Sequence, residues 1–242
     1  MGLLKNFKEN NVCLMRQPAS PQMILLESCH LQHLFSSMTL ASRGSRLFHE
    51  GDQITGVFKL VGGLVALERV DEDGNLIILK ILRPGALFPC SGLLCDGLHN
   101  LAARAITDIS TQFIPMDRIV EAIRNDPSIG LGLIKLSATE IQENENAIFR
   151  MCTVGLSERV LDILTILAEE LGDRDSDGDL HLTLPMAWSD VAAMVGSGPE
   201  VMSRILRVLA KGGRLSFKRR HIIIYQTPRH SGAENANAAA IT

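Results

Sequence analysis

The residues best suited to chemistry are basic and lie near the carboxyl end of the chain. Between Pro199 and Arg229 there are eight Lys and Arg residues against one acid, Glu200. The whole chain of 242 residues has a formal net charge of −3, so this excess of positive charge is local. Clustered guanidinium and ammonium groups attract the phosphate backbone of nucleic acid. We therefore expect a DNA-binding surface in this segment.

The elements that must position these residues have the pattern of two short helices joined by a tight turn. Residues 190–195 predict a first helix that ends at Gly196, and a second helix is predicted from about Ser197 to Lys211. This is the helix-turn-helix pattern, in which the second helix enters the major groove of DNA. Two strand-like runs, 214–217 and 221–225, then predict a hairpin, or wing, with a basic tip.

The second helix is expected to bury one face and to present the other to DNA. The apolar spacing predicts a buried stripe of Val201, Ile205, Val208 and Leu209. The residues expected to contact DNA lie on the remaining face and on the wing: Glu200, Ser203, Arg204, Arg207, Lys211, Lys218, Arg219 and Arg220.

Two of these side chains suit the reading of bases. Arg204 can donate two parallel hydrogen bonds to O6 and N7 of guanine, and Glu200 can accept one from the cytosine amino group. Glu200 also has a structural alternative, because Ser197 stands three residues before it. That spacing is typical of a capping box, in which Glu closes the N-terminus of the helix.

An antiparallel barrel is predicted between Arg43 and Pro115. Short β-like runs at 57–61, 64–70 and 76–82 follow one another without a helix between them. The second and third runs flank Asp71-Glu72-Asp73-Gly74, and an Asp-Gly step of this kind is a strong hairpin signal.

A long helix is predicted from about 127 to 152 on the basis of a heptad pattern. Apolar or small residues recur at spacings of 3, 4, 3, 4 and 3 from Ile134 through Ser137 to Met151. One alternative is that this helix is buried against its own domain. Leu133 and Leu136 supply a separate apolar face for the barrel, which favours pairing with a second copy. The residues expected at that dimer interface are Ile134, Ile141, Asn144, Ile148 and Met151.

Composition excludes several classes of protein. With 46% hydrophobic and 21% charged residues the chain can form a packed core, and 4% aromatics argue against a stacking platform for single strands. No apolar run approaches a membrane span, and the N-terminus lacks a signal peptide pattern. Five cysteines without a Cys-x-x-Cys pair indicate free thiols and a cytoplasmic protein. No catalytic motif is found, so we do not expect an enzyme.

These signals together divide the chain into five parts. A change of pattern at 153–157, around Gly155, indicates a hinge after the long helix. The predicted parts are an N-terminal extension (1–22), a β-roll sensor domain (23–125), the dimerisation helix (126–153), a winged helix-turn-helix domain (154–228) and a disordered tail (229–242).

This order of barrel, long helix, hinge and winged helix-turn-helix resembles the CRP/FNR family of bacterial transcription regulators over roughly residues 23–226. The local matches are Gly51-Asp52, Asp71-Glu72-Asp73-Gly74, Pro84-Gly85 and Glu200-Val201-Met202-Ser203-Arg204. The resemblance implies an α+β protein with a cyclic-nucleotide-binding-like β-roll. It also implies an effector-controlled homodimer that binds double-stranded DNA and contacts RNA polymerase.

The Glu-x-x-Ser-Arg form is similar to the FNR branch, which implies a TTGAT-type palindrome. A different class of function is a ligand-binding module that controls a protein partner without DNA. The basic second helix discriminates between the two, because such a module has no need of it.

The resemblance also bears on the effector. CRP-like members bind cyclic AMP through a Gly-Glu pair and an Arg-Ser pair, and the corresponding positions here are Pro89-Cys90 and His99-Asn100. The missing carboxylate and guanidinium argue against cyclic AMP. Asn144 and Glu145 fall where that branch contacts the nucleotide base. The expected effector pocket is therefore Cys90, His99, Asn100, Asn144 and Glu145.

The cysteines bear on two kinds of metal-containing sensor. An FNR-type iron–sulfur cluster needs three closely spaced N-terminal cysteines, whereas Cys13 and Cys29 lie sixteen residues apart. The run 85–92 is similar to the pocket segment of haem members that sense carbon monoxide, so haem at Cys90 is kept as a candidate. The alternative is that Cys90 and Cys95 are ordinary buried cysteines. No metal ligand is assigned.

Overall fold

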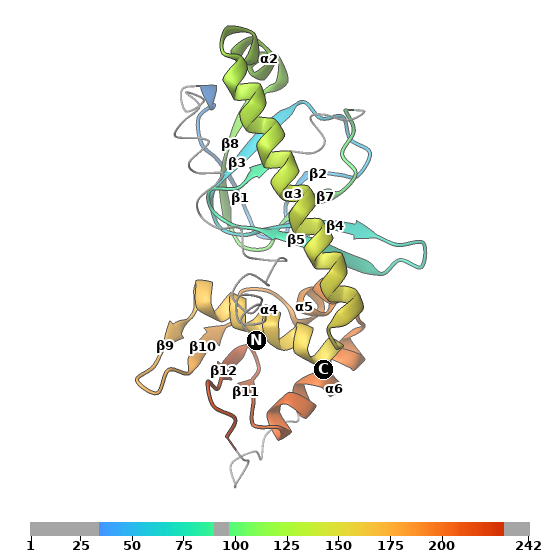
Figure 1. Cartoon of the computed structure of the whole chain (residues 1–242), viewed down its shortest axis with the longest axis vertical. Coiled ribbons are helices and arrows are strands. Elements are labelled where there is room, and N and C mark those ends of the chain that lie inside the picture. The colour runs from blue at the N-terminus through green and yellow to red at the C-terminus, as the bar shows by residue number, and fades with distance from the viewer. Residues whose placement is uncertain (1–33, 90–96, 230–242) are drawn as a thin grey trace, which may run out of the picture. The chain divides into compact units, whose positions relative to one another are not determined.

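The computed structural model describes residues 34–89 and 97–229, which form two compact units (Figure 1). Among these residues the first unit ends at Ile148 and the second begins at Phe149, within one continuous helix. The predicted N-terminal extension (1–22), the tail beyond Arg229, and Cys13, Cys29, Cys90 and Cys95 lie outside the described residues.

The first unit contains two four-stranded antiparallel sheets, with strand orders β1-β8-β3-β6 and β2-β7-β4-β5. Its described strands are β1 (Thr39–Ala41), β2 (Arg46–Phe48), β3 (Gly56–Gly62), β4 (Val65–Val70), β5 (Leu76–Leu82), β6 (Leu87–Phe88), β7 (Ala102–Ala105) and β8 (Ile109–Pro115). The predicted antiparallel barrel is confirmed in this form.

The predicted hairpin between β4 and β5 is present in this unit. Val70 pairs with Leu76, and Gly74 in the connecting turn has φ 83°, a conformation that glycine adopts without strain. The Asp71 carboxylate accepts hydrogen bonds from the backbone N–H of Asp73 at 3.0 Å and of Asn75 at 2.8 Å. The Asp-Gly signal therefore has a direct structural cause.

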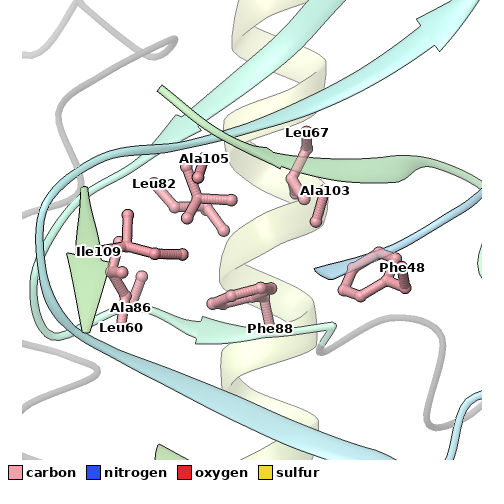
Figure 2. Close-up of a cluster of buried hydrophobic side chains, with 10 residues drawn as sticks. Phe48, Leu60, Leu67, Leu82, Ala86, Phe88, Ala103, Ala105 and Ile109 are labelled. Carbon is pink, nitrogen blue, oxygen red and sulfur yellow. The ribbon is translucent and has the colours of Figure 1, made fainter. Parts of the chain in front are cut away.

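A hydrophobic core fills the space between the two sheets, and it draws side chains from both (Figure 2). Leu60 and Phe88 come from one sheet, and Phe48, Leu67 and Leu82 come from the other. The Phe48 and Phe88 rings lie 6.2 Å apart between centroids. Side chains along each strand point alternately to the two faces of its sheet. Each sheet buries only the face that meets the other sheet, so the apolar side chains of both sheets gather between them.

Two helices follow the barrel, α2 (Met116–Asn125) and α3 (Pro127–Thr153). The bounds of α3 agree with the predicted helix to one residue. Leu136 is buried against Val57 and Ile114 of the barrel, and Leu133 packs on the same cluster. The predicted barrel-facing side of the long helix is confirmed.

The second unit continues from the end of α3 and contains a small antiparallel sheet of order β11-β12-β10-β9. Its further elements are α4 (Leu156–Leu171), β9 (Asp173–Arg174), β10 (Leu180–Thr183), α5 (Trp188–Met194), α6 (Pro199–Lys211), β11 (Leu215–Lys218) and β12 (His221–Ile224). Its core includes Val160, Leu164, Leu182, Leu206 and Ile222, all fully buried. In the described part of the chain no helix is long and apolar enough to cross a membrane.

The acidic segment 169–179 is exposed over most of its length, but it is more than a loop. It contains the short strand β9, and Asp179 is buried. The Asp179 carboxylate accepts hydrogen bonds from the backbone N–H of Gln226 at 2.9 Å and from the Arg229 guanidinium at 2.5 Å. These partners are distant in sequence, which is why charge counting along the chain missed the contact.

Candidate nucleic-acid interface

The face that α6 buries differs from the predicted one by one step along the helix. Ile205 and Leu209 are buried as predicted, and Met202 and Leu206 complete the stripe. Val201 and Val208 are exposed by 38% and 58%, so their assignment to the core is wrong. Both sets satisfy the helical period, and the packing of α6 against α4 and α5 selects the set that contains Met202 and Leu206.

The opposite face of α6 carries the polar residues expected to contact DNA. Ser203 is half-buried, and its hydroxyl accepts a hydrogen bond from the Arg207 guanidinium at 3.3 Å. The exposed side chains on this face are Glu200, Val201, Arg204, Arg207, Val208 and Lys211. They follow one another at intervals of one to four residues and form one continuous surface along the helix.

The capping-box alternative for Glu200 is wrong. Helix α6 begins with Gly198 as its N-cap and Pro199 in its first turn, and no side chain caps it. The Ser197 hydroxyl is buried without a hydrogen-bond partner in the described structure, so it does not serve as the cap. Glu200 is therefore an exposed carboxylate in the first turn of α6.

The turn between α5 and α6 has the tight geometry that the sequence indicates. Gly196 has φ 65°, a left-handed conformation that favours glycine. The Ser197 backbone N–H reaches back to the Ala192 carbonyl at 2.9 Å, and α6 starts immediately afterwards. The predicted helix-turn-helix is confirmed as α5, this turn and α6.

The wing is a tight hairpin between β11 and β12. Lys218 pairs with His221, which leaves Arg219 and Arg220 as the two residues of the tip. Arg219 has φ 56°, an uncommon conformation for a residue with a side chain. The Trp188 indole N–H donates a hydrogen bond to the Arg219 carbonyl at 2.9 Å. The Leu184 backbone N–H donates one to the Arg220 carbonyl at 2.8 Å.

Trp188 is a functional candidate that the sequence pattern did not single out. It is the first residue of α5, and its ring meets Phe217 of β11 edge-on, with centroids 6.3 Å apart. It thereby connects the helix-turn-helix to the basic tip of the wing. The available signal was that the only tryptophan of the chain stands two residues before the predicted first helix (190–195).

Ion pairs divide the eight basic residues of this segment into two groups. Arg214 lies 3.5 Å from the Glu158 carboxylate, and Arg229 pairs with Asp177 and Asp179. The other six have no acidic partner within the part of the chain that the structure describes, and all are exposed: Arg204, Arg207, Lys211, Lys218, Arg219 and Arg220. These six carry the positive charge that remains available to an anionic partner.

The residues expected to form an effector pocket are not gathered by the described structure. His99 is buried and stacks on Phe48, with ring centroids 3.6 Å apart. Burial lowers the pKa of His99, and the Asp52 carboxylate opposes this shift. Asn100, Asn144 and Glu145 are exposed, and within the described ranges no hydrogen bond or ion pair joins residues 97–100 to this part of α3.

A different polar cluster joins the barrel to α3. The Lys80 ammonium of β5 lies 2.8 Å from the Glu143 carboxylate and 3.8 Å from that of Glu140. The Ser137 hydroxyl is buried nearby on the same helix, without a hydrogen-bond partner in the described structure. Sequence reasoning missed this cluster, because a lysine in a strand does not indicate which helix it will meet.

The predicted dimer face of α3 is exposed in the single chain. Ile134, Ile141 and Ile148 are exposed by 54%, 57% and 62%, and Asn144 and Met151 are also exposed. Ser137 is the exception, because it is buried. An unpartnered apolar stripe of this kind on a long helix is typical of an interaction surface.

Comparison with known proteins gives two family matches. Residues 40–126 match the cyclic nucleotide-binding domain, and residues 158–229 match the Crp-like helix-turn-helix domain. The global nitrogen regulator of Synechocystis sp. is 25% identical over 187 residues, which cover 76% of this chain and 82% of that protein. The cAMP-activated global transcriptional regulator CRP of Pasteurella multocida is 26% identical over 203 residues, which cover 84% of this chain and 93% of that protein.

A solved structure extends the comparison to three dimensions. A transcriptional regulator of the CRP/FNR family from Thermus thermophilus aligns with a TM-score of 0.64 and 25% identity, covering 78% of this chain and 94% of that one. The fold and the basic helix-turn-helix thus define a DNA-binding transcription regulator with a cyclic-nucleotide-binding-type β domain. The chain belongs to the CRP/FNR family.

The fold class and family expected from the sequence are therefore confirmed. The relatives are transcription regulators rather than enzymes. A module that acts on a protein partner without DNA is not favoured, because the helix-turn-helix matches that of DNA-binding relatives.

Proposed function

We propose that the protein is a homodimeric, effector-controlled regulator that reads a palindromic DNA site with α6 and its wing. The observation that carries this proposal is the set of six exposed cations without acidic partners on α6 and the wing tip in the described structure. Each such cation that meets a phosphate releases condensed counterions, which makes the affinity depend steeply on salt.

Base reading is assigned to the first two turns of α6. Arg204 is exposed and projects from the same face as Glu200, so guanine and cytosine of one half-site can be read together. We infer a TTGAT-type half-site from the Glu-x-x-Ser-Arg pattern. The wing residues Lys218, Arg219 and Arg220 contact the phosphate backbone and fix the register of α6.

Three alanine variants test this division of roles. Arg204→Ala should cost about 1–3 kcal/mol of binding free energy and relax specificity at one guanine. Lys218→Ala should weaken binding to all sequences alike. It should also reduce the slope of log affinity against log salt concentration by about one, the contribution of one phosphate contact. Arg214→Ala is the matched control, because it removes a positive charge that Glu158 already neutralises. Unchanged binding by Arg204→Ala and Lys218→Ala would refute the interface.

Dimerisation is assigned to the exposed stripe of α3, with Ile134, Ile141, Asn144, Ile148 and Met151. Two copies related by a two-fold axis present two α6 helices, which is why the DNA site should be palindromic. The transcriptional readout then requires contact with RNA polymerase.

The effector is proposed to be something other than cyclic AMP. His99 is packed against Phe48, and Lys80 is committed to Glu140 and Glu143, so neither is available to a cyclic phosphate. Cyclic AMP at millimolar concentration should leave DNA affinity unchanged, and a rise in affinity would refute this. The absorption spectrum of anaerobically purified protein separates the remaining classes: a Soret band supports a haem effector, and a featureless spectrum supports an organic effector.

A further inference from the structure

Two valines interrupt the charged face of α6. Val201 and Val208 are seven residues apart, with Arg204 between them, so all three lie along one line of the helix. Both valines are exposed by more than a third, although the buried stripe is complete without them. Valine is a weaker helix former than alanine, leucine or lysine. Helix propensity does not account for a valine at these positions, and neither valine belongs to the buried stripe.

The major groove offers one apolar feature that an exposed valine can recognise. Thymine carries a C5-methyl group there, and apolar side chains contact it directly. The N-terminal residues of a recognition helix are the ones that reach base edges. Val201 stands in the first turn, between Glu200 and Arg204, whereas Val208 lies two turns later, about 10.5 Å further along the axis. Only Val201 is therefore at the level of the bases.

We propose that Val201 is a specificity-determining residue, which reads a thymine by packing against its C5-methyl group. This inference rests on the proposed DNA-binding function and adds a contact to it. The contact places a thymine beside the bases that Glu200 and Arg204 read. Val208 lies on the same face without a base contact and is the matched control for residue type.

The experiment uses duplexes in which single thymines are replaced by deoxyuridine, a change that removes only the methyl group. The full-length protein first selects its preferred duplex from a random pool, and binding is then measured by fluorescence anisotropy. At one thymine of each half-site, deoxyuridine should weaken wild-type binding by about fourfold per half-site, the effect of one buried methyl group. Val201→Ala should bind the thymine and deoxyuridine duplexes equally at that position, and Val208→Ala should retain the wild-type discrimination.

Several results would overturn the inference. One is that no deoxyuridine position weakens the wild-type complex. Another is that Val201→Ala keeps the wild-type ratio, or that Val208→Ala loses it. Val201 lies outside the buried stripe, so Val201→Ala should remain folded, as its circular dichroism spectrum checks. Val201→Thr keeps one γ-methyl group and should still discriminate thymine from deoxyuridine. Wild-type protein that selects no duplex refutes the proposed function, whereas selective binding without methyl discrimination refutes the Val201 contact alone.

Discussion

The strongest test of the assembly is Ile141→Asp in the middle of the exposed stripe on α3. Ile141 is more than half exposed in the single chain, so a carboxylate at this position meets water when the protein is a monomer. The fold of one chain should therefore tolerate the change. In a pair of α3 helices the two new carboxylates would face each other near the two-fold axis.

The size of the effect follows from the exposed fractions. Complete burial of an isoleucine side chain stabilises by about 1.5–3 kcal/mol, so covering the exposed half of Ile134, Ile141 or Ile148 contributes about 1 kcal/mol each. Six such side chains in a dimer give about 6 kcal/mol. Ile141→Asp removes about 2 kcal/mol of this, and two unpaired buried charges cost at least a few kcal/mol more. The dimer dissociation constant should rise by about a thousandfold or more.

Sedimentation velocity across a concentration series measures this constant. Asn146→Asp is the matched control, because it adds the same charge to an exposed position of α3 on a side away from the stripe. The control should stay dimeric, while Ile141→Asp sediments as a monomer with an unchanged circular dichroism spectrum. An intact Ile141→Asp dimer would refute the assignment of this stripe.

Three further predictions concern other parts of the molecule. Trp188→Phe removes the hydrogen bond to the Arg219 carbonyl, so DNA affinity measured by anisotropy should fall about three- to tenfold, with the salt dependence unchanged because no charge is lost. Lys80→Met removes the ammonium that lies 2.8 Å from the partly buried Glu143 carboxylate, and urea unfolding should show a loss of about 1–3 kcal/mol; an unchanged free energy of unfolding would mean that this ion pair contributes nothing. Burial lowers the pKa of His99 in the folded chain below its ordinary value of 6.5. At a pH between the folded-state pKa and 6.5 only the unfolded chain binds the proton, so the free energy of unfolding falls as the pH is lowered through this range. The pH profile of urea unfolding of His99→Phe should lack this fall.

The parts of the fold that the sequence predicted well depend on local signals. The β4–β5 hairpin follows from the Asp73-Gly74 step, and the bounds of α3 follow from its heptad pattern. The turn before α6 follows from Gly196, and α6 begins at Pro199, two residues after its predicted start at about Ser197. Each of these signals lies within a few residues of the feature that it predicts.

The errors concern which side of an element faces inward. In α6 the set with Val201 and the set with Met202 fit the helical period equally, and only contact with α4 and α5 chooses between them. In α3 the heptad pattern placed Ser137 on the exposed stripe, whereas it is buried. Such choices depend on partners far away in the sequence, so a periodic pattern alone does not contain them.

Helix α5 links the two surfaces that we assign to DNA, although no DNA contact is assigned to α5 itself. Trp188 at its start is hydrogen-bonded to the wing tip, and Gly196 just after its end begins the turn into α6. Arg219 has φ 56°. Its own carbonyl accepts the hydrogen bond from Trp188, and the carbonyl of the next residue, Arg220, accepts one from the Leu184 backbone N–H. Glycine would adopt that backbone conformation with less strain, but it would bring no guanidinium to the tip. The strained arginine is therefore best explained by the charge that it places beside α6.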